Sequence, residues 1–135
     1  CALIEYIARE TKNHRGDIVK AIGEEGIKKL LYDAEVNHCL SFEQVSDEVI
    51  SYYQIKQGTF DTISDCKYSI PSYLDIGRLY SIMIEDCAEA GAEVQELIKI
   101  FSSFISDKIS DFKTDLYYQN PDYLEWSYRE GKLLD

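Results

Sequence analysis

Long apolar runs are absent from this sequence. It contains no stretch of about 18 consecutive apolar residues, which excludes an ordinary transmembrane helix. Two prolines and seven glycines among 135 residues leave little material for flexible linkers or collagen-like repeats. The 45% of hydrophobic residues suffice for one substantial core. We therefore expect residues 1–135 to form a single domain with no membrane contact.

We expect no secretion signal, because Glu5, Arg9 and Glu10 interrupt the first stretch of the chain. Cys1 could carry the lipid of a bacterial lipoprotein, but such a cysteine is usually followed by a flexible polar tether. Here the apolar residues 2–4 resemble the start of an ordered helix. We favour a trimmed start and a cytoplasmic protein.

Basic charge is scarce. The chain has 14 lysines and arginines against 25 acidic residues, a net charge of −11. Nucleic-acid binding requires a basic surface that displaces counterions from phosphates, so we expect no such partner. Ten of the eleven net negative charges lie after residue 40. That part of the chain could face a basic partner, or its charge could only keep the protein soluble and monomeric.

Metal-binding motifs are lacking too. Cys39, Cys66 and Cys87 form no Cys-x-x-Cys pair, and scattered thiols are typical of buried side chains in a reducing compartment. Glu35 and His38 have the Glu-x-x-His spacing of di-iron bundles, but the second copy that such a site needs is missing. We expect neither a metal nor a cofactor.

What is present is helical periodicity. Apolar residues recur at three- and four-residue spacing along most of the chain, which predicts an all-α bundle of about six helices. Ser41 with Gln44 forms a capping box, Ser72 caps the next helix, and Asn120–Pro121 begins the last one, which Gly131 ends.

Two segments stand out from this pattern. Residues 92–116 keep their apolar face without a slip, which predicts one long helix after a helix that ends at Gly91. Residues 58–72 are the least helical, and alternation at Cys66, Tyr68 and Ile70 predicts an ordered loop or short hairpin.

Signatures of catalysis are absent. The sequence has no Walker loop, no Gly-x-Gly-x-x-Gly, no His-Glu-x-x-His and no Gly-x-Ser-x-Gly. His14 lies in a polar turn, and His38 beside Cys39 does not make a nucleophile pair, because adjacent side chains point in different directions. Whether the protein is an enzyme stays open, with a non-enzymatic role favoured.

Tyrosine is unusually common, with eleven copies. Four of them and the single tryptophan lie near the C-terminus: Tyr117, Tyr118, Tyr123, Trp126 and Tyr128. Such side chains are enriched at interfaces, so they predict a binding surface. The alternative is that they pack the last helix onto the bundle.

A second candidate cluster surrounds Gly77, a residue that costs a helix about 1 kcal/mol relative to alanine. A close helix contact or a ligand against the backbone would explain it. Asp75, Arg78 and Tyr80 flank this glycine and could line a small pocket.

The stretches Ser72–Tyr80 and Asn120–Tyr123 resemble segments of small uncharacterised bacterial all-helical proteins of unassigned function. The resemblance implies a bacterial cytoplasmic protein and carries no activity over to any residue.

These observations predict a non-enzymatic interaction module that binds a basic protein partner through its acidic, tyrosine-rich C-terminal half. An antitoxin or immunity protein that neutralises a basic toxin has this character. One alternative is a small enzyme or ligand-binding protein that uses the pocket near Asp75, Arg78 and Tyr80. Another is an acidic protein that mimics a nucleic acid. The oligomeric state stays open.

Overall fold

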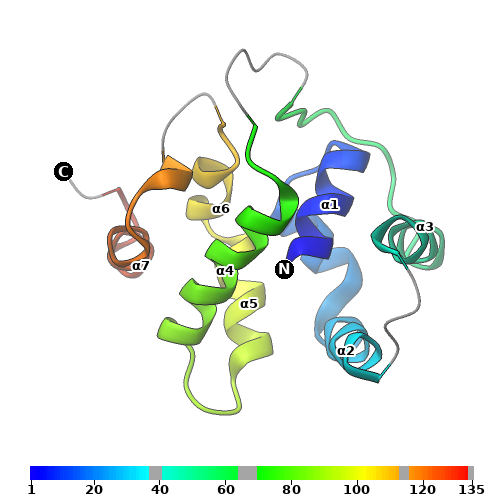
Figure 1. The fold of residues 1–135 in the computed structure, drawn as a ribbon, viewed down its shortest axis with the longest axis horizontal. Helices are drawn as coiled ribbons and strands as arrows, with labels where there is room; N and C mark the ends of the chain where they lie inside the picture. Colours follow the sequence, from blue (N-terminus) through cyan, green and yellow to red (C-terminus); the bar gives the residue numbers. More distant parts are fainter. Residues whose placement is uncertain (37–40, 64–69, 113–115, 134–135) are drawn as a thin grey trace.

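The structure is a computed structural model that describes residues 1–36, 41–63, 70–112 and 116–133. In these ranges the chain forms seven α-helices and one short 3-10 helix (Figure 1). They are α1 (Ala2–Thr11), α2 (Arg15–Val36), α3 (Phe42–Tyr52), α4 (Tyr73–Cys87), α5 (Glu93–Ser102), α6 (Phe104–Ile109), η1 (Leu116–Tyr118) and α7 (Pro121–Glu130). No strand occurs in these ranges, so the expected all-α class is confirmed.

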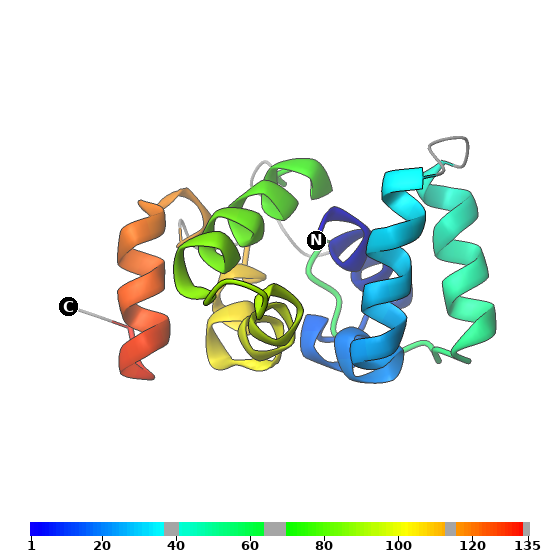
Figure 2. The ribbon, with the colours of Figure 1, turned by 90° about the horizontal axis from the view of Figure 1, so that it is seen from below.

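The helices form an elongated bundle with α3 at one end and α7 at the other (Figures 1 and 2). In the middle, α1 packs on α2 and α4, α2 packs on α5, and α4 packs on α5 and α7. Their facing sides share one apolar core, which includes Ile7, Tyr80, Met83, Phe101 and Ile105. None of the described helices combines the length and apolar character needed to cross a lipid bilayer.

The helix starts expected from capping residues are confirmed. Ser41 and Gln44 form the reciprocal capping box of α3, and the Ser72 hydroxyl accepts a hydrogen bond from the backbone N–H of Asp75. Asn120 caps α7 through the N–H of Asp122, and Gly131 ends that helix in the left-handed conformation.

Two expected helix boundaries are wrong. The helix before Gly91 already ends at Cys87, and the single helix expected over residues 92–116 is broken at Ser103, where the backbone is extended (φ −86°, ψ 169°). The Ser103 hydroxyl donates to the carbonyl of Ile100 at 2.7 Å, an alternative to the next helical turn. Phe101 and Ile105 are both buried, so the apolar face continues across the break. The spacing of the apolar residues therefore gives no sign that the helix is interrupted.

A kink at Gly23 divides α2. Gly23 has φ +76° and ψ 169°, a conformation that residues with a Cβ rarely adopt. The second half of α2 then stands beside α3 at one end of the molecule (Figure 2). Gly26 lies inside α2, in the half that follows the kink.

The segment that follows α3 lies along the end of α1. The N–H groups of Gly58 and Phe60 donate to the carbonyls of Thr11 and Lys12, both at 2.8 Å. The expected loop or hairpin falls largely on residues 64–69, which lie outside the described residues. Its described flanks, residues 58–63 and 70–72, contain neither helix nor strand.

Candidate functional site

A groove with a volume of about 1160 Å³ opens between the start of α1, the second half of α2, and α3. This volume lies just above the roughly 300–1,000 Å³ typical of small-molecule pockets, so the groove is large enough to accept a segment of a protein. Leu97 of α5 lines it as well.

The wall formed by α3 is apolar along one side of the helix. Phe42, Val45, Val49 and Tyr52 follow one another at spacings of three or four residues and all line the groove. Val49 is buried, whereas 75% of Tyr52 is exposed. Among the described residues this helix packs mainly against α1, and Phe42 and Tyr52, which line the groove at its two ends, stay exposed.

The opposite wall belongs to α2. Leu30 and Leu31 line it, and Leu31 is 45% exposed although leucine is usually buried. Lys29 reaches across from this wall, with its Nζ 5.8 Å from the ring centroid of Tyr52, within the range of a cation–π contact. One lysine therefore bridges the two walls.

A glycine brings the two walls together at one point. A Cβ on Gly26 of α2 would lie 2.5 Å from the hydroxyl of Tyr53, the residue that ends α3. A larger residue there would displace the Tyr53 ring, which lines the groove. Because the tyrosine is half-buried against the core, this contact fixes the end of α3 relative to α2.

The groove has a negative rim. Asp33, Asp47 and Glu48 line it, whereas Lys29 is the single lysine or arginine among the described lining residues. Segment 41–55, which includes α3, carries three acidic side chains and no lysine or arginine. Acidic groups around apolar walls favour a ligand that is apolar on one face and basic at its edges.

An aromatic cluster extends this surface past the groove. The rings of Tyr6, Phe42 and Tyr73 come from α1, α3 and α4, with centroid separations of 5.1 to 6.3 Å. Burial, together with nearby carboxylates of which Glu10 acts most strongly, raises the pKa of Tyr6. The combination of aromatic and acidic side chains expected for the C-terminal half is thus present here.

The C-terminal aromatic residues expected to form a binding surface differ in their exposure. Tyr117, Tyr123 and Tyr128 are half-buried and pack against the core, whereas Trp126 is 55% exposed. The side chain of Tyr118 lies outside the described part of the chain. These rings share the α7 end of the molecule, but packing onto the bundle occupies three of them.

Tyr128 shows this packing role in detail. Its hydroxyl donates to Glu96 of α5 at 3.0 Å. Burial and the negative charge of Glu96 raise the pKa of Tyr128. The tyrosine therefore stays neutral and anchors α7 to α5.

The proposed pocket residues Asp75, Arg78 and Tyr80 do not come together. Tyr80 is completely buried, stacks on Phe101 with ring centroids 4.0 Å apart, and donates to the hydroxyl of Ser106 at 3.1 Å. Asp75 and Arg78 are exposed on α4. Tyr80 belongs to the same buried apolar stripe as Met83, so it does not line a pocket together with Asp75 and Arg78.

Gly77 is explained by a close helix contact. A Cβ there would lie 2.7 Å from the backbone N and Cα of Ala2. The glycine therefore lets α4 approach the first turn of α1, and no ligand is needed to account for it.

Comparison with known proteins adds no relative. No protein-family model matches the chain, and neither curated proteins nor solved structures give a match. Any functional conclusion therefore depends on the chain's own residues.

The sequence does not reveal the groove, because the apolar stripes of α2 and α3 look like ordinary core-facing stripes. Exposed Leu31 and Tyr52 carry no local signal that their faces lack a partner.

Proposed function

We propose that this chain is a protein-interaction module that binds a basic amphipathic helix of a partner protein in the groove between α2 and α3. The observation that carries the proposal is the apolar side of α3, which among the described residues leaves Phe42 and Tyr52 exposed, opposed by exposed Leu31 and rimmed by Asp47 and Glu48. A helix laid into an apolar groove is a common mode of peptide recognition.

The dimensions and charges limit the partner. The eleven residues of α3 span about 16 Å, so the groove accepts roughly three turns of a helix. Apolar side chains at i, i+3, i+4 and i+7 would face the groove, and lysines or arginines on the flanks would face the acidic rim. A basic toxin neutralised by an antitoxin or immunity protein belongs to this class of partner.

Binding of designed peptides tests the proposal. A fluorescent helical peptide of about 14 residues with a leucine face and lysine flanks is titrated with the full chain, and anisotropy is measured at several salt concentrations. A matched peptide has glutamate in place of every lysine. We expect the lysine peptide to bind more tightly and to weaken as salt increases, because exposed charges are screened.

Matched variants locate the site. Leu31→Glu and Tyr52→Ala should each weaken binding at least about tenfold, as for residues at the centre of an interface. Trp126→Ala removes an exposed aromatic side chain from the opposite end of the molecule and should leave binding unchanged. The proposal fails if no peptide binds at ~100 µM, an affinity weaker than about −5.5 kcal/mol. It also fails if the glutamate peptide binds equally well, or if Trp126→Ala is the damaging change.

A further inference from the structure

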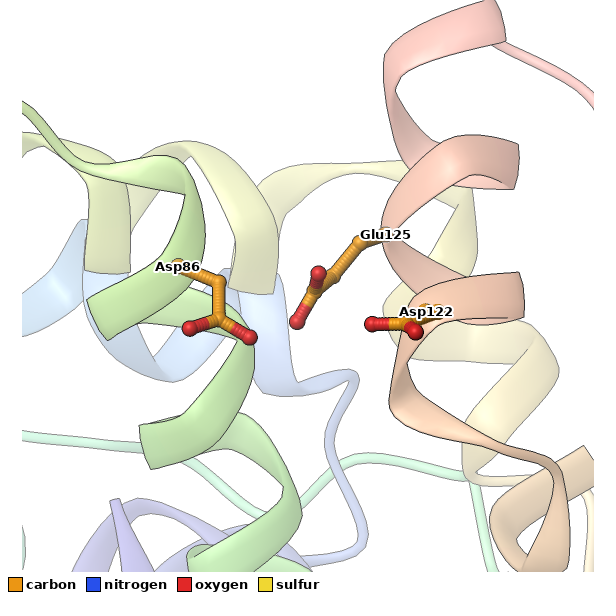
Figure 3. Close-up of side chains that lie close together, drawn as sticks. All are labelled: Asp86, Asp122 and Glu125. Atoms are coloured by element: carbon orange, nitrogen blue, oxygen red, sulfur yellow. The ribbon is translucent and has the colours of Figure 1, made fainter.

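Three carboxylates meet at the end of the molecule opposite the groove (Figures 1 and 3). Asp86 comes from the last turn of α4, and Asp122 and Glu125 come from one face of α7, three residues apart. Each offers one oxygen, and these oxygens all lie within 4.8 Å of one another. The packing of α4 against α7 therefore concentrates three negative charges.

Glu125 is the unusual member of this cluster. Its side chain is only 6% exposed, and its carboxylate lies between the two aspartates (Figure 3). The oxygen Oε1 is buried and has no hydrogen-bond partner among the described residues. A buried carboxylate oxygen without a donor is costly, since water no longer solvates it. Burial of this carboxylate is therefore favourable only when a proton or a cation neutralises it.

The nearest basic side chain does not fill that role. Arg129 donates from Nη2 to the backbone carbonyl of Asp86 at 3.4 Å and lies 5.4 Å from the ring centroid of Trp126. Within the described residues, no lysine or arginine forms a salt bridge with any of the three carboxylates. The charge of the cluster is thus unbalanced by direct ion pairs.

We propose that Asp86, Asp122 and Glu125 bind a divalent cation, Ca²⁺ rather than Mg²⁺, that links α4 to α7. Carboxylate oxygens are the preferred ligands of both ions. The three oxygens all lie within 4.8 Å of one another, so one ion could contact all of them. Ca²⁺ accepts irregular coordination, whereas Mg²⁺ demands a near-ideal octahedron and gives up its waters reluctantly, so ligands from two packed helices favour Ca²⁺. Exposed Asp86 and Asp122 leave room for waters that complete the coordination.

The surroundings support a cation at this place. The last turn of α4 carries no basic residue of its own, and Arg129 of α7 donates to the Asp86 carbonyl there at 3.4 Å. A cation between the three carboxylates would balance their charge and give the buried Glu125 carboxylate a ligand bond. The acidic groups near Glu125 are Asp86 and Asp122, and Arg129 is the opposing positive charge.

A calcium titration of the full chain tests the proposal. Trp126 is the only tryptophan, it adjoins Glu125, and Arg129 contacts both its ring and Asp86. Its fluorescence should therefore report binding, with calorimetry as a second measurement. CaCl2 is added to the EDTA-treated, dialysed protein at pH 8 and constant ionic strength. We expect saturation by one Ca²⁺ per chain at about 10⁻⁵–10⁻³ M, and weaker binding of Mg²⁺.

Substitutions distinguish a specific Ca²⁺ site from a general attraction of Ca²⁺ to an acidic protein. Asp86→Asn and Glu125→Gln should each weaken Ca²⁺ binding at least tenfold. Asp122→Asn should weaken it too, and because Asp122 is exposed this substitution leaves the buried packing intact. Glu85→Gln removes the same charge from the neighbouring position of α4 and should leave affinity unchanged. The proposal is overturned by a titration that does not saturate, by equal loss in Glu85→Gln, or by equal affinity for Mg²⁺. The peptide-binding test at the groove involves none of these residues, so the two proposals fail separately.

Discussion

Arg15 forms a two-point ion pair with Glu5 although both side chains are completely buried. Its Nε donates to Oε1 at 2.8 Å and its Nη2 donates to Oε2 at 2.5 Å. Arg9 donates to the same carboxylate at 2.7 Å and also to the carbonyl of Pro71. One carboxylate thus joins α1, α2 and the segment before α4.

Removing one partner of this pair should be strongly destabilising. Glu5→Gln leaves two guanidinium groups beside an uncharged amide, and breaking a buried pair typically costs about 3–5 kcal/mol. The free energy of unfolding in urea measures this loss. Glu10→Gln, an exposed change on the same helix, should stay within about 0.5 kcal/mol.

The double substitution Glu5→Leu with Arg15→Met should be less damaging than Glu5→Gln. Apolar side chains of similar volume remove the desolvation cost of both buried charges, which offsets the lost attraction. Arg9 loses its bond to Glu5 but is partly exposed and keeps its bond to the Pro71 carbonyl. If the double variant is less stable than Glu5→Gln, the attraction within the ion pair exceeds the desolvation cost of its two charges.

The two close-packed glycines should respond differently to alanine. In Gly77→Ala the new Cβ meets the backbone of Ala2, which cannot move without shifting α1, so we expect a loss of about 1–3 kcal/mol. In Gly26→Ala it meets the flexible end of the Tyr53 side chain and the Ile22 methyl. A gain in helix propensity of about 1 kcal/mol offsets part of that strain.

Thermal or urea unfolding of both variants checks this contrast. Arg78→Ala, an exposed change beside Gly77, controls for altered helix propensity in α4. Equal losses of stability in the two glycine variants would mean that the backbone of α1 shifts as readily as the Tyr53 ring.

Glu125 should make stability depend on pH when no divalent cation is present. Burial, with the nearby Asp86 carboxyl, raises its pKa from about 4.5 to about 7. Between these values the folded chain holds more protons than the unfolded chain, so the free energy of unfolding falls as pH rises from about 4.5 to 7. Outside that window the contribution of Glu125 does not change with pH. Glu125→Gln resembles the protonated form and should lack this fall.

The measurement is the free energy of unfolding from pH 4 to 8 in EDTA for the wild type and Glu125→Gln. Taking the difference between the two curves cancels the other carboxyl groups. Glu85→Gln should keep the wild-type slope. A difference curve that is flat between pH 4.5 and 7 would contradict the raised pKa.

Helix α3 should open more readily than α4. Only Ser46 and Val49 are buried on α3, against six residues on α4, and local opening is easiest where few apolar contacts are lost. Native-state hydrogen exchange should therefore show faster exchange of amides in α3. The lysine peptide that fills the groove should slow this exchange and leave α4 unchanged.

The helix caps could be predicted from the sequence because they depend on neighbouring residues. Ser41, Ser72 and Asn120 each bind a backbone N–H two or three positions along the chain. The break at Ser103 could not be predicted, because α5 and α6 present the same apolar face. Local signals thus locate helix starts better than helix interruptions.

The functional surfaces were harder to predict because they depend on tertiary packing. Asp122 and Glu125 have a helical spacing, but Asp86 lies on another helix and is one of many acidic residues. Tyr80 could have been assigned to the core from its spacing to Ile76 and Ile84, both buried. Helical spacing does not reveal the groove, because the groove depends on which helices pack against α3 among the described residues.

The contact between Arg9 and the carbonyl of Pro71 spans 62 residues, and this has a consequence for synthesis. A ribosome adds about 5–20 residues per second, so α1 is made roughly 3–12 seconds before the segment that covers it. During that interval the apolar face of α1, with Ile4 and Ile7, has no α4 to pack on. The nascent chain should therefore expose this apolar face until residues 73–87 have left the exit tunnel, and shortening that delay should reduce aggregation during expression.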